Sequence, residues 1–232
     1  MIDSPANAIE NPLAAAYYAD QAAQWTVKVV ENEHIARDTY RIRLACPELA
    51  RRITPGQFVM VRLPEANDPL LGRPLALYDT YVDDSGQPLG IDVVYLVIGK
   101  MTTRLAQVAA GEAIALWGPL GNGFSCQPAQ HLVMVAGGIG QTPFLALGRE
   151  RLGGRKYGDA SRSAPVCQRV TLCYGVRNVE LAAGVDDFRA AGVDVRLSSD
   201  DGSTGRPGLV TELLDELLSE GGRHDIRIAC CG

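Results

Sequence analysis

The chain has 232 residues, of which 47% are hydrophobic and 21% are charged. Such a chain can bury a core without disulfides or metals, and its composition excludes a wholly disordered protein. Its 22 Lys and Arg against 27 Asp and Glu give a formal net charge of −5, so it lacks the basic surplus of nucleic-acid-binding proteins. No apolar run reaches the roughly 18 residues of a membrane-spanning helix.

The cysteines indicate a reducing compartment and give no sign of a metal site. None of the six has CxxC spacing to another, and none lies near a histidine in a zinc-like pattern. The N-terminus lacks a charged segment followed by an apolar core, so no signal peptide is predicted. We therefore expect a cytoplasmic protein without a metal site.

The first half of the chain has the pattern of an antiparallel barrel. Residues 1–24 are predicted to form a loose N-terminal arm with a short helix at 13–23. From Trp25 onward, apolar and polar residues alternate with period two, as in strands with one solvated face. Turn residues separate the short segments, which favours a closed barrel over 25–124. The expected strands are 25–29, 40–44, 57–63, 91–98 and 113–117.

Residues 125–232 have a different pattern, in which apolar strands alternate with helices. This alternation is typical of a parallel sheet covered on both faces. The polar stretch 153–165 is expected to be a mobile surface excursion. The expected strands are 131–136, 169–174, 193–198 and 226–230, and the expected helices are 143–151, 179–191 and 208–219. The predicted fold class is therefore a β-barrel followed by an α/β domain.

A glycine-rich turn after the first apolar strand is the strongest single signal. Gly137, Gly138 and Gly140 are followed by Thr142 and then by Pro143, which starts a helix. Glycine allows a ligand to approach the backbone closely, and a helix N-terminus offers unpaired N–H groups to a phosphate. A tight turn without a ligand remains an open alternative. The motif is not the GxGxxG of dehydrogenases, because Pro143 occupies the third glycine position.

Three further segments are consistent with a nucleotide site. Arg73 lies at a strand edge, where a guanidinium can pair with a pyrophosphate, although an isolated arginine is more often a solvated surface charge. Gly99 precedes an expected helix at 103–108, whose N-terminus can be capped by a threonine or can bind phosphate. A second glycine-rich loop, 118–124, lies between the two halves, and clefts between domains are favoured ligand sites.

Six motifs occur in order along the chain: Pro55-Gly56-Gln57-Phe58, Arg73-Pro74-Leu75, Gly99 with Thr102, Gly118-Pro119-Leu120-Gly121, Gly137-Gly138-Ile139-Gly140 and Cys231-Gly232. In this order they resemble the ferredoxin–NADP reductase superfamily. Segments 68–74, 118–124 and 199–203 look most like the electron-transfer subunit of dihydroorotate dehydrogenase. The resemblance covers 25–232 and implies an antiparallel FAD-binding barrel followed by a parallel-sheet NAD-binding domain.

The resemblance also implies roles for individual residues. Arg73 matches a contact to the flavin pyrophosphate, and Gly99 and Thr102 match the turn that receives the FAD phosphates. Cys231, the candidate catalytic residue, and Gly232 match the segment beside the nicotinamide. The residues that match the flavin-facing strands are Pro74, Leu75, Ala76, Leu96, Val97 and Ile98, and those that match the nicotinamide-cofactor loop are Gly137, Gly138, Gly140 and Thr142.

The chain departs from the family pattern at three points. Ala76 stands where Ser or Thr is usual, which leaves only a backbone N–H for the flavin N5 region. Met101 stands where a second glycine is usual, so a looser approach of the phosphate is expected. The family continues past the position of Gly232 with a cysteine cluster that binds a [2Fe-2S] centre, and the six cysteines here are too scattered to supply its ligands. Either the sequence is truncated or it lacks the cluster, and its end on an apolar strand favours truncation.

The function implied by the resemblance is that of an FAD- and NAD-dependent oxidoreductase. It would act in pyrimidine biosynthesis as an electron-transfer subunit, in a hetero-oligomer with the catalytic subunit of dihydroorotate dehydrogenase. One alternative is another FAD/NAD reductase of the superfamily, of the sulfhydrogenase, transhydrogenase or flavin reductase type. The other is a non-catalytic binding module on the same fold.

Two acidic residues and one histidine bear on specificity and catalysis. Asp200 and Asp201 can bond ribose hydroxyls and repel a 2′-phosphate, which favours NAD over NADP. A solvated Asp-Asp-Gly turn is an equally consistent interpretation. His131 begins an apolar strand and is expected to be structural.

Overall fold

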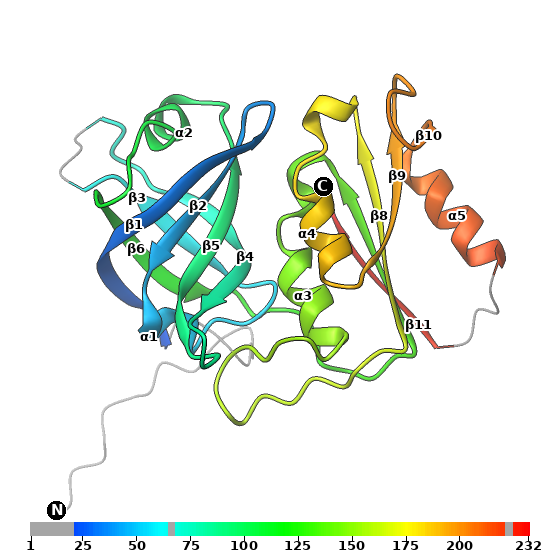
Figure 1. Ribbon diagram of the computed structural model, residues 1–232, viewed down its shortest axis with the longest axis horizontal. Coiled ribbons are helices and arrows are strands. Elements are labelled where there is room, and N and C mark those ends of the chain that lie inside the picture. Colours follow the sequence, from blue (N-terminus) through cyan, green and yellow to red (C-terminus); the bar gives the residue numbers. More distant parts are fainter. Residues whose placement is uncertain (1–20, 65–67, 221–224) are drawn as a thin grey trace, which may run out of the picture.

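The computed structural model describes residues 21–64, 68–220 and 225–232, which form two bodies that lie side by side (Figure 1). The first body is a closed antiparallel barrel with the strand order β1-β2-β5-β4-β3-β6. Its strands are β1 (Ala23–Ala36), β2 (Thr39–Ala45), β3 (Phe58–Arg62), β4 (Arg73–Val82), β5 (Pro88–Leu96) and β6 (Ala113–Leu120). Two short helices, α1 (Pro47–Ala50) and α2 (Lys100–Leu105), accompany them.

The barrel forms because alternate residues of its strands are apolar and point inward. Val27 and Val29 of β1, and Ile42 and Leu44 of β2, are all buried in one core cluster, whereas residues between them are solvated. Closing the sheet leaves no strand edge unpaired, since β6 pairs with both β1 and β3.

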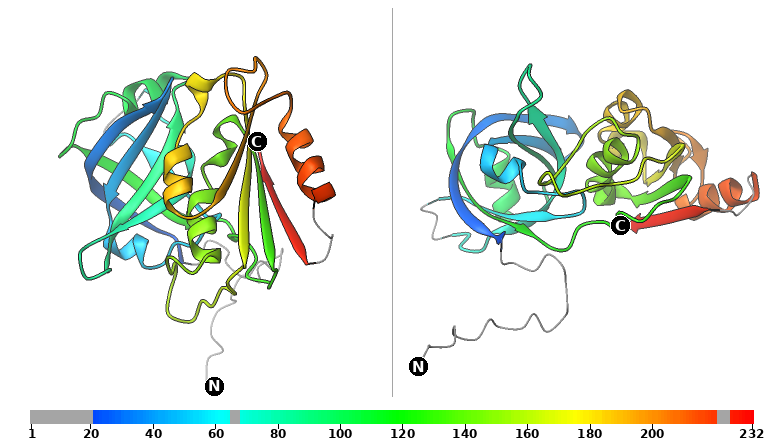
Figure 2. Two further views of the ribbon diagram at one scale, coloured as in Figure 1. Left: turned by 45° about the vertical axis from the view of Figure 1, so that its right-hand side comes forward. Right: turned by 90° about the horizontal axis from the view of Figure 1, so that it is seen from below.

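The second body is a parallel sheet with the order β10-β9-β8-β7-β11. Its strands are β7 (His131–Gly137), β8 (Arg169–Val176), β9 (Asp194–Ser199), β10 (Arg206–Pro207) and β11 (Ile226–Cys231). Helices α3 (Phe144–Arg151) and α4 (Val185–Ala190) lie on the face toward the barrel, and α5 (Val210–Glu220) covers the other face (Figures 1 and 2). The predicted fold class, a barrel followed by a parallel sheet covered on both faces, is confirmed.

Some element predictions were wrong in detail. The helix expected at 179–191 is divided into the 3₁₀ turn η3 (Val179–Leu181) and α4, because Gly184 has a left-handed φ of +72° between them. The helix expected at 103–108 is α2, which begins earlier. Helix α1 and strand β10 were not predicted, because both segments are too short to show a periodic pattern of apolar residues. Most of the arm helix expected at 13–23 lies outside the described residues, and Ala23 begins β1.

The stretch 153–165 lies largely at the surface, as expected, but it is anchored to the rest of the molecule. It packs against the barrel, because Tyr157 is buried in the barrel's core cluster and donates a hydrogen bond to Asp79 of β4 at 2.6 Å. Arg162 forms a two-point ion pair with Glu150 of α3, at 2.7 and 2.9 Å. The Tyr157 contact thus joins the stretch to the barrel, whereas the Arg162 pair holds it to α3 of the second body.

None of the helices in the described part of the chain is both long enough and apolar enough to cross a membrane.

Candidate functional site

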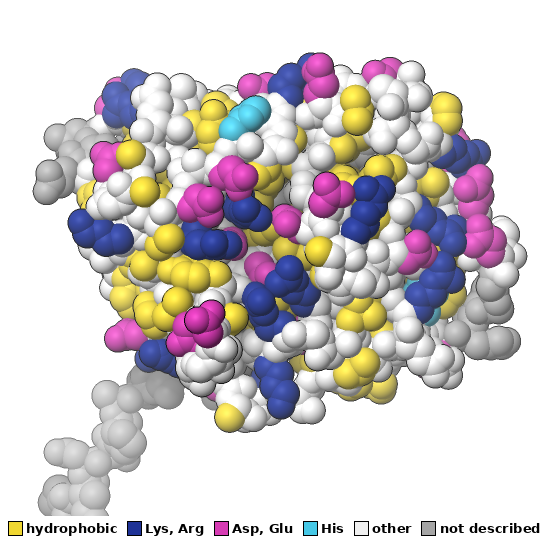
Figure 3. All heavy atoms as spheres, in the orientation of Figure 1, with side chains coloured by type: hydrophobic (Ala, Val, Ile, Leu, Met, Phe, Trp, Pro, Cys, Tyr) yellow, Lys and Arg dark blue, Asp and Glu magenta, His cyan; other side chains and the backbone are white. Residues whose placement is uncertain are grey.

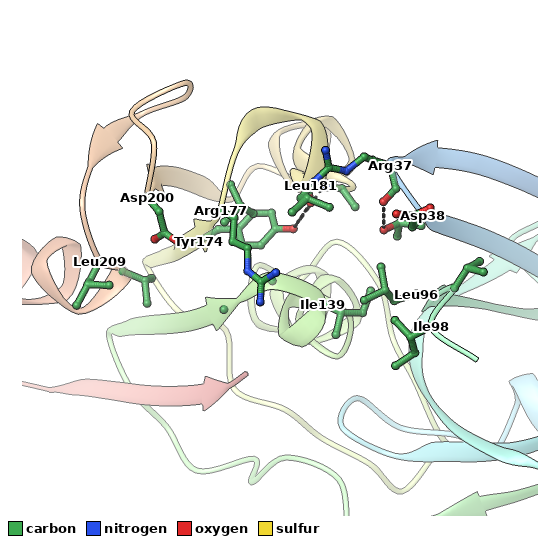
Figure 4. Close-up of a pocket in the computed structure, with 18 of the residues that line it drawn as sticks. Arg37, Asp38, Leu96, Ile98, Ile139, Tyr174, Arg177, Leu181, Asp200 and Leu209 are labelled. Carbon is green, nitrogen blue, oxygen red and sulfur yellow. Dashed lines mark hydrogen bonds between the residues drawn. The ribbon is translucent and has the colours of Figure 1, made fainter. Parts of the chain in front are cut away.

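A cleft of about 640 Å³ lies along the seam between the two bodies (Figure 4). The barrel contributes the end of β5 and the residues after it, Leu96, Val97 and Ile98, together with the β1–β2 turn. The sheet contributes the C-terminal ends of β7 and β8 and the loop before α5. Ligands of open parallel sheets bind at this edge of the sheet, outside the carboxyl ends of the strands.

The glycine loop after β7 borders this cleft. Gly137 and Gly138 line it, and Gly138 has a φ of +52° with no atom within 4 Å of the position that a Cβ would occupy. This left-handed backbone favours glycine, and the space beside it is open. A 3₁₀ turn, η2 (Gly138–Gln141), then leads into α3.

Two other predicted members of this loop are buried instead of facing the cleft. A Cβ on Gly140 would lie 2.2 Å from the carbonyl oxygen of Cys231, so glycine is needed there for packing against β11. Thr142 is 7% exposed and directly precedes the N-cap of α3. The loop thus brings Gly137 and Gly138 to the cleft, whereas Gly140 and Thr142 support it from behind.

The turn before α2 offers a second open glycine. Gly99 has an extended backbone, and nothing lies within 4 Å of the position of a Cβ. The Thr102 hydroxyl accepts hydrogen bonds from the backbone N–H groups of Ile98 and Gly99, both at 3.2 Å. The Met101 side chain is buried in the barrel core, so it anchors α2 and leaves the turn unobstructed.

The predicted residues of β4 lie on the barrel and do not border the cleft. Arg73 is exposed, and among the described residues its guanidinium donates only to the carbonyl oxygens of Leu71 and Gly72, at 3.3 and 3.1 Å. Pro74 is exposed, and Leu75 and Ala76 are partly buried on the same strand. The structure thus groups Leu96–Ile98, Gly137, Gly138 and Asp200 around the cleft and leaves the start of β4 outside it.

The two acidic residues predicted to bind ribose have different surroundings. Asp200 follows β9 and borders the cleft. Asp201 is exposed, and its carboxylate accepts a hydrogen bond from the Ser203 N–H at 2.9 Å. Hydrogen bonds from Ser203 lower the pKa of Asp201 below its ordinary value. Asp201 therefore stabilises a solvated turn, which was the alternative to ribose binding for both residues.

The sequence patterns did not single out Arg177, which borders the cleft directly after β8. Its side chain extends into the space between Tyr174 and Ile139 (Figure 4). Within the described residues it has no hydrogen-bond or ion-pair partner, so its charge is available to a ligand. Its position immediately after an apolar parallel strand is the signal that could have identified it.

The C-terminal end of β11 lies beside the glycine loop. The α-carbon of Gly232 is 3.9 Å from the ideal Cβ position of Gly137. Burial raises the pKa of the Cys231 thiol above its ordinary value, so this thiol is protonated at neutral pH. Cys231 is the last residue of β11 and pairs with Ala136 of β7, so it lies at the same edge of the sheet as the cleft.

The cysteines do not fit an iron–sulfur cluster. All six are described and carry free thiols, three of them buried at separate places. Within the described ranges no three or more His, Cys, Asp or Glu residues are grouped so as to hold a metal. A [2Fe-2S] centre needs four closely placed ligands, which these residues do not supply.

His131 is tied into the sheet. Its Nε2 lies 2.9 Å from the Thr171 hydroxyl on the neighbouring strand β8, at the opposite end of β7 from the glycine loop. This contact agrees with a structural role.

The comparisons with known proteins fit this geometry. The sequence-family model of the oxidoreductase FAD-binding domain matches residues 26–124 of this chain. The electron transfer subunit of dihydroorotate dehydrogenase B (NAD(+)) from Desulforamulus reducens is 35% identical over 189 residues, which cover 81% of this chain and 66% of the relative. The corresponding subunit from Enterococcus faecalis is 32% identical over 214 residues, which cover 90% of this chain and 74% of the relative.

A solved structure shows the same architecture. The NADH-dependent reduced ferredoxin-NADP oxidoreductase, studied for flavin-based electron bifurcation, has a TM-score of 0.70 and 26% identity, covering 89% of this chain and 67% of that chain. This chain spans about two thirds to three quarters of the length of the curated relatives it matches. It belongs to the family of dihydroorotate dehydrogenase B electron transfer subunits, oxidoreductases built on the ferredoxin reductase-like fold.

Proposed function

We propose that this chain is the FAD-containing subunit that passes electrons between NAD(H) and a partner dihydroorotate dehydrogenase. The observation that carries the proposal is the cleft at the seam, which joins the end of β5 to the glycine loop after β7. One wall comes from the FAD-binding body and the other from a parallel sheet at its ligand-binding edge. In this proposal the FAD-binding domain comprises 25–124 and the NAD-binding domain comprises 125–232.

The barrel has a cradle that fits FAD. Gly99 faces open space that a side chain would fill, and its extended backbone could be adopted by any residue, so the missing side chain suits a ligand at that point. Arg73, exposed and without an acidic partner in the described part of the chain, would pair with the pyrophosphate. Pro74 to Ala76 and Leu96 to Ile98 would lie along the ring system. When bound, FAD would accept two electrons as hydride and release them singly.

The sheet has groups that fit a dinucleotide. Gly138 leaves room for the pyrophosphate to approach the backbone, and Arg177 supplies to the cleft a positive charge that has no ion-pair partner among the described residues. Asp200 would accept hydrogen bonds from the ribose hydroxyls and would repel a 2′-phosphate, which favours NAD over NADP.

Apolar side chains would keep water from the reacting rings. Ile98 and Ile139 approach the cleft from opposite bodies and are 82% and 38% exposed, so each has surface to cover with a ligand. Cys231 and Gly232 would pack beside the nicotinamide at the end of β11. The chain would thus orient the two rings and exclude water, which accounts for its part in the transfer.

The partner is proposed from the relatives' names. They are electron transfer subunits of dihydroorotate dehydrogenase B, so a catalytic subunit that oxidises dihydroorotate would form a hetero-oligomer with this chain in pyrimidine biosynthesis, in the cytoplasm. The residues described here provide no cluster ligands for the iron–sulfur centre that the family resemblance implies.

Anaerobic titration tests the proposal. The purified chain is mixed with FAD, freed of excess cofactor, and titrated with NADH while the flavin absorbance near its visible maximum is followed. We expect a yellow protein whose flavin is bleached by one equivalent of NADH. A protein that stays colourless after FAD addition would favour a non-catalytic binding module instead.

A second candidate differs only in the partner. The 26% identity to the NADH-dependent reduced ferredoxin-NADP oxidoreductase favours a reductase subunit that serves another electron carrier. Electron delivery to a co-purified dihydroorotate-oxidising subunit distinguishes the two, because only the first candidate couples dihydroorotate oxidation to NAD⁺ reduction.

A further inference from the structure

Two consecutive residues of β4, Tyr78 and Asp79, both reach from the barrel into the sheet body. Neighbouring side chains of a regular strand point to opposite faces. The register of β4 on β5 shifts between Leu77 and Asp79, where Leu77 pairs with Val93 and Asp79 with Asp92. Such a β-bulge redirects side chains, and here it allows two successive ones to face the same neighbouring body.

Asp79 is the centre of a buried polar cluster that joins the bodies. Its Oδ2 lies 2.7 Å from Nη1 of Arg149 on α3, and its Oδ1 lies 3.1 Å from Nη1 of Arg155. The Tyr157 hydroxyl and the Thr80 N–H also donate to Oδ1, at 2.6 and 2.8 Å. The side chain is 7% exposed. Removing such a carboxylate leaves two arginines without their buried partner.

Tyr78 makes the second connection. Its hydroxyl donates to Oδ2 of Asp187 on α4 at 2.7 Å, and Arg41 of β2 lies 3.5 Å from the same oxygen. Tyr78 and Val94 belong to the core cluster of the sheet body, whereas Ala146 of α3 belongs to that of the barrel. The two cores therefore interlock beneath the polar contacts.

The elements joined in this way are those that carry the two proposed cofactor sites. Strand β4 begins with Arg73 and the residues proposed to lie along the flavin, and Asp79 lies on the same strand. Helix α3, which carries Arg149, begins after the glycine loop proposed to hold the dinucleotide. We propose that Asp79, with Tyr78, is a positioning residue that fixes the nicotinamide against the flavin by holding β4 to α3 and α4. The inference rests on the proposed function.

The opposite end of the interface is joined more loosely. Arg37, in the β1–β2 turn at the cleft, donates its N–H to the Glu180 carbonyl oxygen of η3 at 2.9 Å and pairs with the Glu180 carboxylate at 2.6 Å, but these side chains are 49% and 63% exposed. Acidic and basic side chains gather over the seam on the face shown in Figure 3. Exposed ion pairs are screened by water and add little rigidity. In the proposal, the buried end at Asp79, with its several charged and hydrogen-bonded contacts, contributes most to the angle between the bodies.

The test uses FAD-loaded Asp79→Asn, mixed anaerobically with saturating NADH in a stopped-flow instrument. Asparagine keeps the size of the side chain and removes its charge. We expect the dissociation constants for FAD and NADH to stay unchanged. The rate of flavin bleaching should fall roughly 10- to 100-fold, because hydride transfer is sensitive to displacements of about 1 Å. The long-wavelength charge-transfer absorbance between nicotinamide and flavin should weaken in parallel.

Asp92→Asn is the matched control. Asp92 is also a buried barrel carboxylate, but its two-point pair with Arg43, at 2.8 Å for both contacts, lies within the barrel. This variant should lose stability and keep the bleaching rate. An equal loss of rate in Asp92→Asn would mean that the effect comes from general destabilisation and would overturn the inference.

A second variant covers the case in which Asp79→Asn does not fold. Tyr78→Phe removes only the hydroxyl bonded to Asp187, and we expect the same loss of rate and of charge-transfer absorbance, to a smaller extent. Wild-type bleaching in the folded variants would overturn the positioning role alone. A wild-type flavin that NADH does not bleach would instead contradict the proposed function.

Discussion

Gly184 leaves open the space that the hydroxyl of Tyr78 occupies. A Cβ on residue 184 would lie only 2.3 Å from the Tyr78 Oη, and Gly184 also has a φ of +72°. A side chain here would displace Tyr78 from Asp187 and push α4 away from the barrel. The contact of Tyr78 with α4 therefore depends on a residue that has no side chain.

Gly184→Ala should lower the free energy of unfolding by about 2–4 kcal/mol, the sum of the backbone strain and the steric displacement. The matched control is Gly86→Ala. Gly86 has a φ of +80° and no atom within 4 Å of the position of a Cβ. The loss of stability in Gly86→Ala therefore measures the backbone strain alone. Urea unfolding of both variants gives the difference. Equal losses would contradict the steric contribution of Tyr78.

Arg73→Ala should weaken FAD retention about tenfold with the fold intact, because it removes a charge-assisted contact to the pyrophosphate. In the described part of the chain the guanidinium donates only to carbonyl oxygens of its own loop, so the free protein should lose little stability. The dissociation constant is measured by recovery of flavin fluorescence. Arg62→Ala, which removes another exposed arginine from the barrel, is the control. Unchanged FAD affinity in Arg73→Ala would count against the assignment.

Asp200→Asn should raise the ratio of kcat/KM for NADPH to that for NADH by roughly tenfold, or about 1.4 kcal/mol. The substitution removes the carboxylate that would bond the ribose hydroxyls and repel a 2′-phosphate. Steady-state kinetics with both nucleotides and an artificial electron acceptor measure the ratio. Asp201→Asn should leave it unchanged, since Asp201 stabilises its own turn. A ratio that moves equally in both variants would exclude a specific role for Asp200.

The stability of the sheet should fall as the solution becomes acidic, in part through His131. Burial lowers the pKa of His131, and Arg169 and Arg196 lower it further, while Asp194 opposes them. The folded state therefore favours the neutral ring, whereas the unfolded chain takes up a proton near the ordinary pKa of about 6.5. Because the unfolded state binds more protons in this window, the free energy of unfolding decreases as the pH falls through it.

Urea unfolding at a series of pH values from about 7.5 to about 5.5 measures this slope. His131→Gln should reduce the slope, because glutamine takes up no proton in this pH window. A slope that His131→Gln does not alter would assign the pH dependence to other groups.

Much of each body could be predicted from the sequence because its signals are local. The period-two alternation in β1 and β2 depends only on which face of a strand is buried, and the burial found there follows it. The apolar runs of β7 and β8 likewise predict strands covered on both faces. The glycine at 138 was identified because a turn between strand and helix limits the residues that fit.

Contacts between distant segments could not be predicted in the same way. Arg177 and Arg162 are both arginines in polar surroundings, yet one faces the cleft and the other pairs with Glu150. Gly140 belongs to the same motif as Gly138, but it is needed because the carbonyl of Cys231 lies against it. These differences depend on residues far away in the chain.

By itself, the sequence determined most of the strands and helices, the change from barrel to parallel sheet and the motifs of the family, since these follow from periodicity and from local backbone requirements. Only the tertiary structure decided how the two bodies meet. The bulge in β4 that turns Tyr78 and Asp79 toward α4 and α3 depends on pairing with β5, and the partners of both side chains lie on other elements. Contacts between residues far apart in the sequence depend on how the elements pack, and a local sequence pattern does not predict that packing.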